Sequence, residues 1–172
     1  MTEQDPPFIE TVVPKASNVA WVLTLVGDGY LDMALVYAKG QRDLKTRGDI
    51  VLLLVNVSEE ALRLRWPKIM ALRVRVSFST QPFNNNTVTS DEFRAYENKA
   101  NHWWEFVKFR ALQMLDYEMV IMNDADVLHL TNNDNLFDEA PGTCTDGPWS
   151  PVNGGFVVVR PSQEDYRLLL TR

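Results

Sequence analysis

Residues 119–128 read MVIMNDADVL, an apolar run that leads directly into two aspartates, Asp124 and Asp126. Four consecutive apolar residues before a polar turn are typical of a short buried strand. Such a strand delivers both carboxylates at its carboxyl end, and the small Ala125 between them allows a tight turn. Two close carboxylates repel each other unless a cation neutralises them. The stretch therefore predicts a divalent-metal site, although a D-x-D triplet alone also fits a simple cap for the next segment.

Outward from this strand, apolar runs alternate with helical patterns. We expect Ser58 to cap the second helix, Pro67 to disturb it near its end, and the alternating LRVRVSF strand to leave one face in water. Strands separated by helices predict an α/β fold with a mostly parallel central sheet and helices on both faces. Further strands are predicted over residues 18–26, 49–55, 72–78 and 152–159, helices over 30–44, 58–66, 102–115 and 161–170, and a polar loop over 79–98.

The composition is that of an ordinary globular domain, with 45% hydrophobic and 23% charged residues among 172. We expect residues 1–17 to be an extension and residues 18–172 to be one domain. The net charge of −6 argues against nucleic-acid binding. No basic and apolar leader and no long apolar run is present, so we expect no membrane segment. This favours the cytoplasm, with the Golgi lumen as the alternative if the chain is a fragment.

The order of motifs resembles that of the glycogenin-like glycosyltransferases of family 8. In that family an apolar strand and D-A-D precede a short segment ending in Leu-Phe, and here residues 133–138 read NDNLFD. The family's next landmark, an Asn-Gly-Gly or Asn-Ser-Gly turn that leads a strand into Pro-Ser, matches residues 153–162, NGGFVVVRPS. The landmarks follow the family's order and extend from about Val19 onward.

This resemblance implies a GT-A type Rossmann-like fold and a retaining transfer of a hexose from a UDP-sugar to a glycan or protein acceptor. Asp124 and Asp126 would bind Mn²⁺, with Mg²⁺ as the alternative, and Tyr30 would stack on uracil. We also expect a homodimer. His129 lies near the metal corner in the sequence, but we do not expect it to be a metal ligand. The donor-nucleotide residues would be Thr24, Val26, Gly27, Tyr30, Lys99, Lys108, Asp124, Ala125 and Asp126, and the sugar and acceptor side would be Asn153, Gly154 and Gly155.

Two positions and one family segment qualify the resemblance. Lys99 stands where the family often has arginine, which would change a bidentate phosphate contact into a point charge. Gly154 replaces the more usual serine and removes its hydroxyl. A His-x-x-Gly-x-x-Lys segment, which carries the family's third metal ligand, would fall beyond Arg172. We therefore expect a C-terminally truncated member with weak or no transferase activity on its own.

Two other readings fit parts of the sequence. One is a protein that binds nucleotide sugars but has lost its chemistry. The other is a phosphatase of the haloacid dehalogenase type, whose Asp-x-Asp-x-(Thr/Val) motif matches residues 124–127 and uses the first aspartate as nucleophile. At least three predicted strands precede the motif here, and no lysine follows Asp126, so the phosphatase is the weaker alternative.

Overall fold

The computed structural model describes residues 9–10, 13–79, 107–145 and 153–171. These residues form one seven-stranded sheet with the order β1-β4-β3-β2-β5-β7-β6. The four neighbouring strands from β4 to β5 are parallel, and the three outer strands are antiparallel to their neighbours. The strands are β1 (Ile9–Glu10), β2 (Val19–Val26), β3 (Asp49–Val55), β4 (Val74–Phe78), β5 (Met119–Asn123), β6 (Cys144–Thr145) and β7 (Asn153–Val159).

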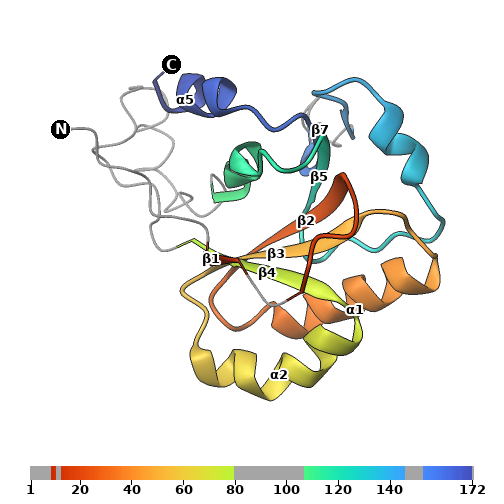
Figure 1. Ribbon diagram of the computed structural model, residues 1–172, viewed down its shortest axis with the longest axis vertical. Coiled ribbons are helices and arrows are strands. Elements are labelled where there is room, and N and C mark those ends of the chain that lie inside the picture. The colour runs from red at the N-terminus through yellow and green to blue at the C-terminus, as the bar shows by residue number, and fades with distance from the viewer. Residues whose placement is uncertain (1–8, 11–12, 80–106, 146–152, 172) are drawn as a thin grey trace.

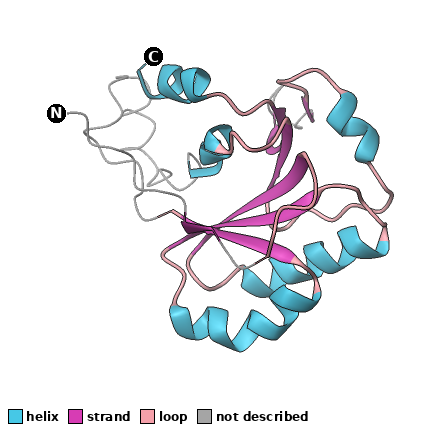
Figure 2. Ribbon diagram, viewed as in Figure 1, coloured by secondary structure: helices cyan, strands magenta, loops and turns pink. Residues whose placement is uncertain are grey.

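Helices cover both faces of the sheet, as predicted (Figures 1 and 2). The helices α1 (Leu31–Asp43) and α2 (Glu59–Ala71) share one core with Trp21 and Leu23 of β2. On the other face, Ala20 and Val22 pack with the 3-10 helix η1 (Val107–Gln113) and with α5 (Gln163–Thr171). Successive strand residues point to opposite faces, so β2 supplies both cores. The second 3-10 helix, η2 (Asp134–Asp138), packs Phe137 into the first core.

The second helix begins as predicted but ends later. The Ser58 hydroxyl accepts a hydrogen bond from the Ala61 amide at 3.2 Å, which makes Ser58 the N-cap. The prediction that the helix stops near Trp66 is wrong, because Pro67 lies inside it. Ile69, beyond the proline, is fully buried, and burial of such a side chain is worth about 1.5–3 kcal/mol. That burial offsets the backbone hydrogen bond that Pro67 cannot make.

The expectation of a solvent-exposed face on β4 is also wrong. Arg75 and Ser77 are both buried. The Arg75 guanidinium donates to the Tyr117 hydroxyl and lies 3.8 Å from the Asp49 carboxylate. Alternation of basic and apolar residues does not distinguish a face in water from a face that buries an ion pair.

The remaining predicted elements agree with the described parts of the chain. The strands β2, β3, β5 and β7 and the helices α1, α5 and η2 lie within a few residues of their predicted bounds. The expected helix over 102–115 is a 3-10 helix in its described part, residues 107–113, and the polar loop lies almost entirely outside the described residues. No helix in the described ranges is both long and apolar enough to cross a membrane.

Candidate functional site

Those residues predicted to bind the donor that the structure describes lie near the carboxyl edge of the parallel strands. Pairing between β2 and β5 ends at Leu23 and Asn123, where β5 gives way to Asp124, while β2 continues to Val26. The antiparallel β7 pairs with β5, and its amino end therefore reaches the same edge. Sheets of this kind bind their ligands beyond the carboxyl ends of the strands.

Asp124 forms the centre of this edge. Strand alternation directs Asn123 toward α1, and the next residue, Asp124, meets Lys108 of η1 on the opposite face. Lys108 Nζ lies 2.9 Å from Asp124 Oδ1 and donates a second hydrogen bond to the Gly154 carbonyl at 3.1 Å. The Asp124 amide donates to the Gly155 carbonyl at 2.9 Å. The structure thus brings together η1, the two-aspartate corner and the start of β7.

The donor atoms at this corner suit a hard divalent cation. Asp124 is 45% exposed, and Asp126 is exposed and makes no hydrogen bond or ion pair to other described residues. The Val127 amide donates to the Asp124 carbonyl at 3.2 Å and closes the turn between them. Within the described ranges, no group of three or more aspartate, glutamate, histidine or cysteine side chains converges. Mg²⁺ and similar ions commonly use one or two carboxylates together with substrate phosphates and water, and the two aspartates fit that pattern.

The loop after β2 lies beside the corner and is held by α2. Gly27 has a φ of 71°, which favours glycine, and its amide donates to the Val55 carbonyl at 2.9 Å. The Asp28 carboxylate accepts hydrogen bonds from the Ser58 amide and hydroxyl, both at 2.7 Å. These bonds, the amide bond first, lower the pKa of Asp28. The sequence did not predict this contact between Asp28 and Ser58, although an aspartate in a turn opposite an N-cap serine is a usable signal.

Tyr30 precedes α1 at its N-cap position and is 51% exposed. Its ring is therefore not a core residue and is accessible to a planar base. Thr24 and Val26 are half-buried at the end of β2, on the face that meets η1. Ala125 packs against the core on the α1 side, and its contact with nucleotide stays a prediction.

Two of the predicted residues have no described side chain. Lys99 lies outside the described residues, and only the backbone of Asn153 is described. Gly154 is exposed, and a Cβ atom there would lie 3.7 Å from Lys108 Nζ, an ordinary contact distance. A Cβ atom at this position is therefore accommodated without a steric clash.

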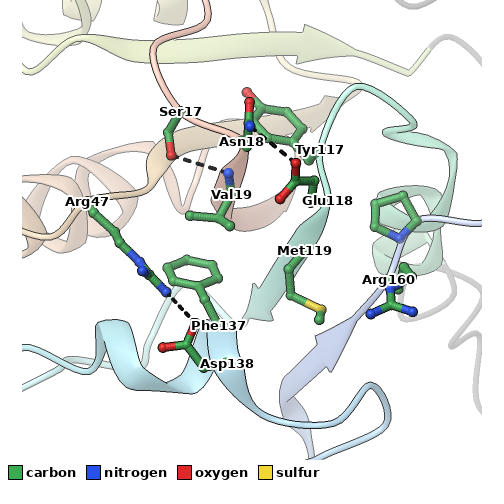
Figure 3. Close-up of a pocket in the computed structure, with 11 residues that line it drawn as sticks. Ser17, Asn18, Val19, Arg47, Tyr117, Glu118, Met119, Phe137, Asp138 and Arg160 are labelled. Atoms are coloured by element: carbon green, nitrogen blue, oxygen red, sulfur yellow. Dashed lines mark hydrogen bonds and ion pairs between the residues drawn. The ribbon is translucent and has the colours of Figure 1, made fainter.

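A cavity of about 730 Å³ lies at the opposite edge of the sheet (Figure 3). It is lined by residues at the amino ends of β2 and β5, such as Val19 and Met119, together with Phe137 and Arg160. Its charged groups largely satisfy one another, since Arg47 pairs with Asp138 at 2.9 Å and Asn18 donates to Glu118 at 3.2 Å. The cavity is therefore not the predicted donor site.

Comparison with known proteins agrees with the predicted family. Glycogenin from Komagataella phaffii is 28% identical over 160 residues, which cover 88% of this chain and 38% of that protein. Inositol phosphorylceramide glucuronosyltransferase 1 from Arabidopsis thaliana is 29% identical over 151 residues, 87% of this chain and 26% of that protein. The chain is a homologue of the glycogenin-like glycosyltransferases of family 8.

Two further comparisons concern a short region and the fold. The A. thaliana UDP-glucuronate:xylan alpha-glucuronosyltransferase 1 is 35% identical over 74 residues, which cover 43% of this chain and 11% of that protein. The crystal structure of glycosyltransferase GlyE from Streptococcus pneumoniae superposes with a TM-score of 0.51 at 12% identity, covering 87% of this chain and 36% of that one. The predicted GT-A fold is thereby confirmed. No protein-family model matches the chain. The chain spans at most 38% of the length of these relatives.

Proposed function

We propose that this chain binds the donor of a glycosyltransferase reaction, a UDP-sugar, and takes part in transferring its hexose to a glycan or protein acceptor with retention of configuration. The observation that carries the proposal is the convergence of Asp124, Lys108 and the start of β7 at the carboxyl edge of the sheet. The relatives named above support the transferase class, and one of them is named for UDP-glucuronate.

In this proposal Asp124 and Asp126 hold Mn²⁺ or Mg²⁺. When bound, the cation stabilises the negative charge that develops on the departing diphosphate. Lys108, already at this corner, supplies a further positive charge for phosphate oxygens, as an ammonium point charge does. Tyr30 offers its exposed ring to the uracil base. Thr24, Val26, Gly27, Lys99 and Ala125 complete the nucleotide side, and Asn153, Gly154 and Gly155 face the sugar and acceptor.

Calorimetric titration with UDP, with and without Mn²⁺, tests the metal site. UDP should bind the wild-type chain more tightly with Mn²⁺, and Asp126→Asn should weaken that binding by at least about tenfold, since even outer residues of metal sites commonly contribute that much. Asp116→Asn is the matched control, because Asp116 is exposed on the turn before β5, at the opposite edge of the sheet. Equal UDP binding with and without Mn²⁺ would overturn the metal role, and absence of UDP binding would overturn the proposal.

Turnover separates an enzyme from a protein that only binds nucleotide sugars. UDP release from UDP-glucose, UDP-galactose and UDP-glucuronate, measured with Mn²⁺ and candidate glycan acceptors, would support transfer. Metal-dependent UDP binding without release under any of these conditions would favour the binding protein. The homodimer stays a prediction that sedimentation analysis can check.

A further inference from the structure

The side chain just before the aspartate corner is buried and needs a polar partner. Asn123 ends β5 and is 4% exposed, on the core face that includes Trp21. A buried amide without partners would cost about 1–3 kcal/mol. Its Oδ1 lies 3.1 Å from Nε2 of His129, which comes after the corner in the chain. The same histidine approaches Asn133, with its Nδ1 3.2 Å from the Asn133 Nδ2.

Neighbouring hydrogen bonds fix the direction of both contacts. Asn123 Nδ2 donates to the Ile121 carbonyl at 3.3 Å, so its Oδ1 faces the imidazole. The Thr131 hydroxyl donates to Asn133 Oδ1 at 3.1 Å, which leaves the Asn133 amide group to donate to the ring. His129 Nε2 therefore donates and Nδ1 accepts, a pattern that only the neutral imidazole provides. Burial lowers the pKa of His129 and favours the same form.

Two aromatic rings, those of Trp21 and Tyr37, pack against this imidazole. The Trp21 ring meets it edge-on at 4.8 Å between centroids, and the Tyr37 ring does so at 5.6 Å. Trp21 and Tyr37 are almost completely buried. Both ring nitrogens of the half-buried His129 are therefore engaged by asparagine side chains in this arrangement.

We propose that His129 is a positioning residue for the two-aspartate corner, because it bridges Asn123 before the corner and Asn133 after it. The proposal rests on the proposed function, in which Asp124 and Asp126 bind the metal. The bridge joins both ends of the segment 123–133, which contains the exposed Asp126. A fixed segment holds the two carboxylates in one arrangement before a cation binds. Less conformational entropy is then lost on binding.

The test compares three variants with the wild type. His129→Phe keeps an aromatic ring but removes both hydrogen bonds, whereas His129→Gln can still donate to Asn123. Tyr37→Phe is the control for a weakened core, because it removes the hydroxyl that accepts from Gln41 at 2.8 Å and leaves the bridge intact. The readouts are the Mn²⁺-dependent gain in UDP affinity and the hydrogen-exchange rate of the Val127 amide, both measured well below each variant's melting temperature.

We expect His129→Phe to reduce the Mn²⁺-dependent gain by about fivefold or more and to speed Val127 exchange by a similar factor. We expect His129→Gln to keep most of the Mn²⁺-dependent gain in UDP affinity and to slow Val127 exchange back toward the wild-type rate. Tyr37→Phe should change neither the gain nor the exchange rate. Unchanged exchange and affinity in a folded His129→Phe variant would overturn the positioning role. If the wild type shows no Mn²⁺-dependent UDP binding, the proposed function fails, and the exchange rate alone still decides whether His129 fixes the segment.

Discussion

Lys108 Nζ lies 2.9 Å from Oδ1 of Asp124, so the side chain predicted to bind phosphate is paired with a side chain predicted to bind metal. The two residues are 16 positions apart and come from different elements, η1 and the end of β5. In the absence of a metal, the ammonium partly balances the negative charge of the corner. If Asp124 binds a cation as proposed, the cation would therefore compete with Lys108 for the same carboxylate.

This competition predicts opposite effects of Lys108→Gln on two ligands. Affinity for Mn²⁺ alone should rise roughly threefold to tenfold, because a positive charge about 3 Å from the carboxylate is removed. Affinity for UDP in the presence of Mn²⁺ should fall by a similar factor. Lys39→Gln is the matched control, since Lys39 pairs with Asp43 on the exposed side of α1. Calorimetry of both variants checks this, and weaker Mn²⁺ binding by Lys108→Gln would contradict the competition.

The exposed ring of Tyr30 predicts a contribution to base binding. Tyr30→Ala should weaken UDP binding by about tenfold, because stacking of a base on an aromatic ring is commonly worth about 1–3 kcal/mol. Tyr30→Phe keeps the ring and should bind UDP within about twofold of the wild type. Neither change should lower the melting temperature appreciably, since the side chain is 51% exposed. Equal UDP affinity for the alanine and phenylalanine variants would contradict stacking of the Tyr30 ring on the base.

The bonds between Asp28 and Ser58 predict an acid-dependent loss of stability. The pKa of Asp28 lies below its ordinary value of 3.8, chiefly because the Ser58 amide donates to the carboxylate. Its contribution is therefore complete above the ordinary value and is lost as the pH falls through the lowered one. Asp28→Asn should lower the melting temperature at neutral pH and match the wild type in strong acid. Thermal melts across this range check it, and an Asp116→Asn control should show a smaller difference.

The buried cluster of Asp49, Arg75 and Tyr117 predicts large effects on stability. Tyr117 donates to Asp49 Oδ2 at 3.0 Å, and Arg75 lies 3.8 Å from the same oxygen. Tyr117→Phe should lower the free energy of unfolding by about 1–3 kcal/mol, and Arg75→Leu by about 3–5 kcal/mol, because a buried carboxylate loses its cation. Urea unfolding measures both, with Tyr30→Phe as the exposed control. UDP affinity should not change in variants that remain folded.

The close approach of Gly48 to Trp21 predicts that a methyl group is not tolerated there. A Cβ at Gly48 would lie 2.8 Å from Trp21 Cδ1 and 3.0 Å from Phe137 Cζ. Gly48→Ala should therefore lower the free energy of unfolding by about 1–3 kcal/mol. Gly40→Ala is the matched control, because a Cβ there meets nothing within 4 Å and alanine favours the helix by about 1 kcal/mol. Urea unfolding that ranks the two variants in the opposite order would contradict this account.

Local patterns in the sequence were sufficient to predict most elements and the position of the aspartate corner. The apolar run of β5, the Ser58 cap and the fully buried β3 each follow from neighbouring residues, since strand burial and helix capping depend on short stretches.

Only the tertiary structure decided which side chains meet. Asp49 and Tyr117 are 68 residues apart, and their contact, which buries Arg75, depends on how β3, β4 and the turn before β5 pack. The pairing of Lys108 with Asp124 and the bridge from Asn123 through His129 to Asn133 depend on strand register and on which face each residue occupies. Sequence spacing sets the alternation of side chains along a strand, whereas their partners are set by the packing of elements that are distant in the chain.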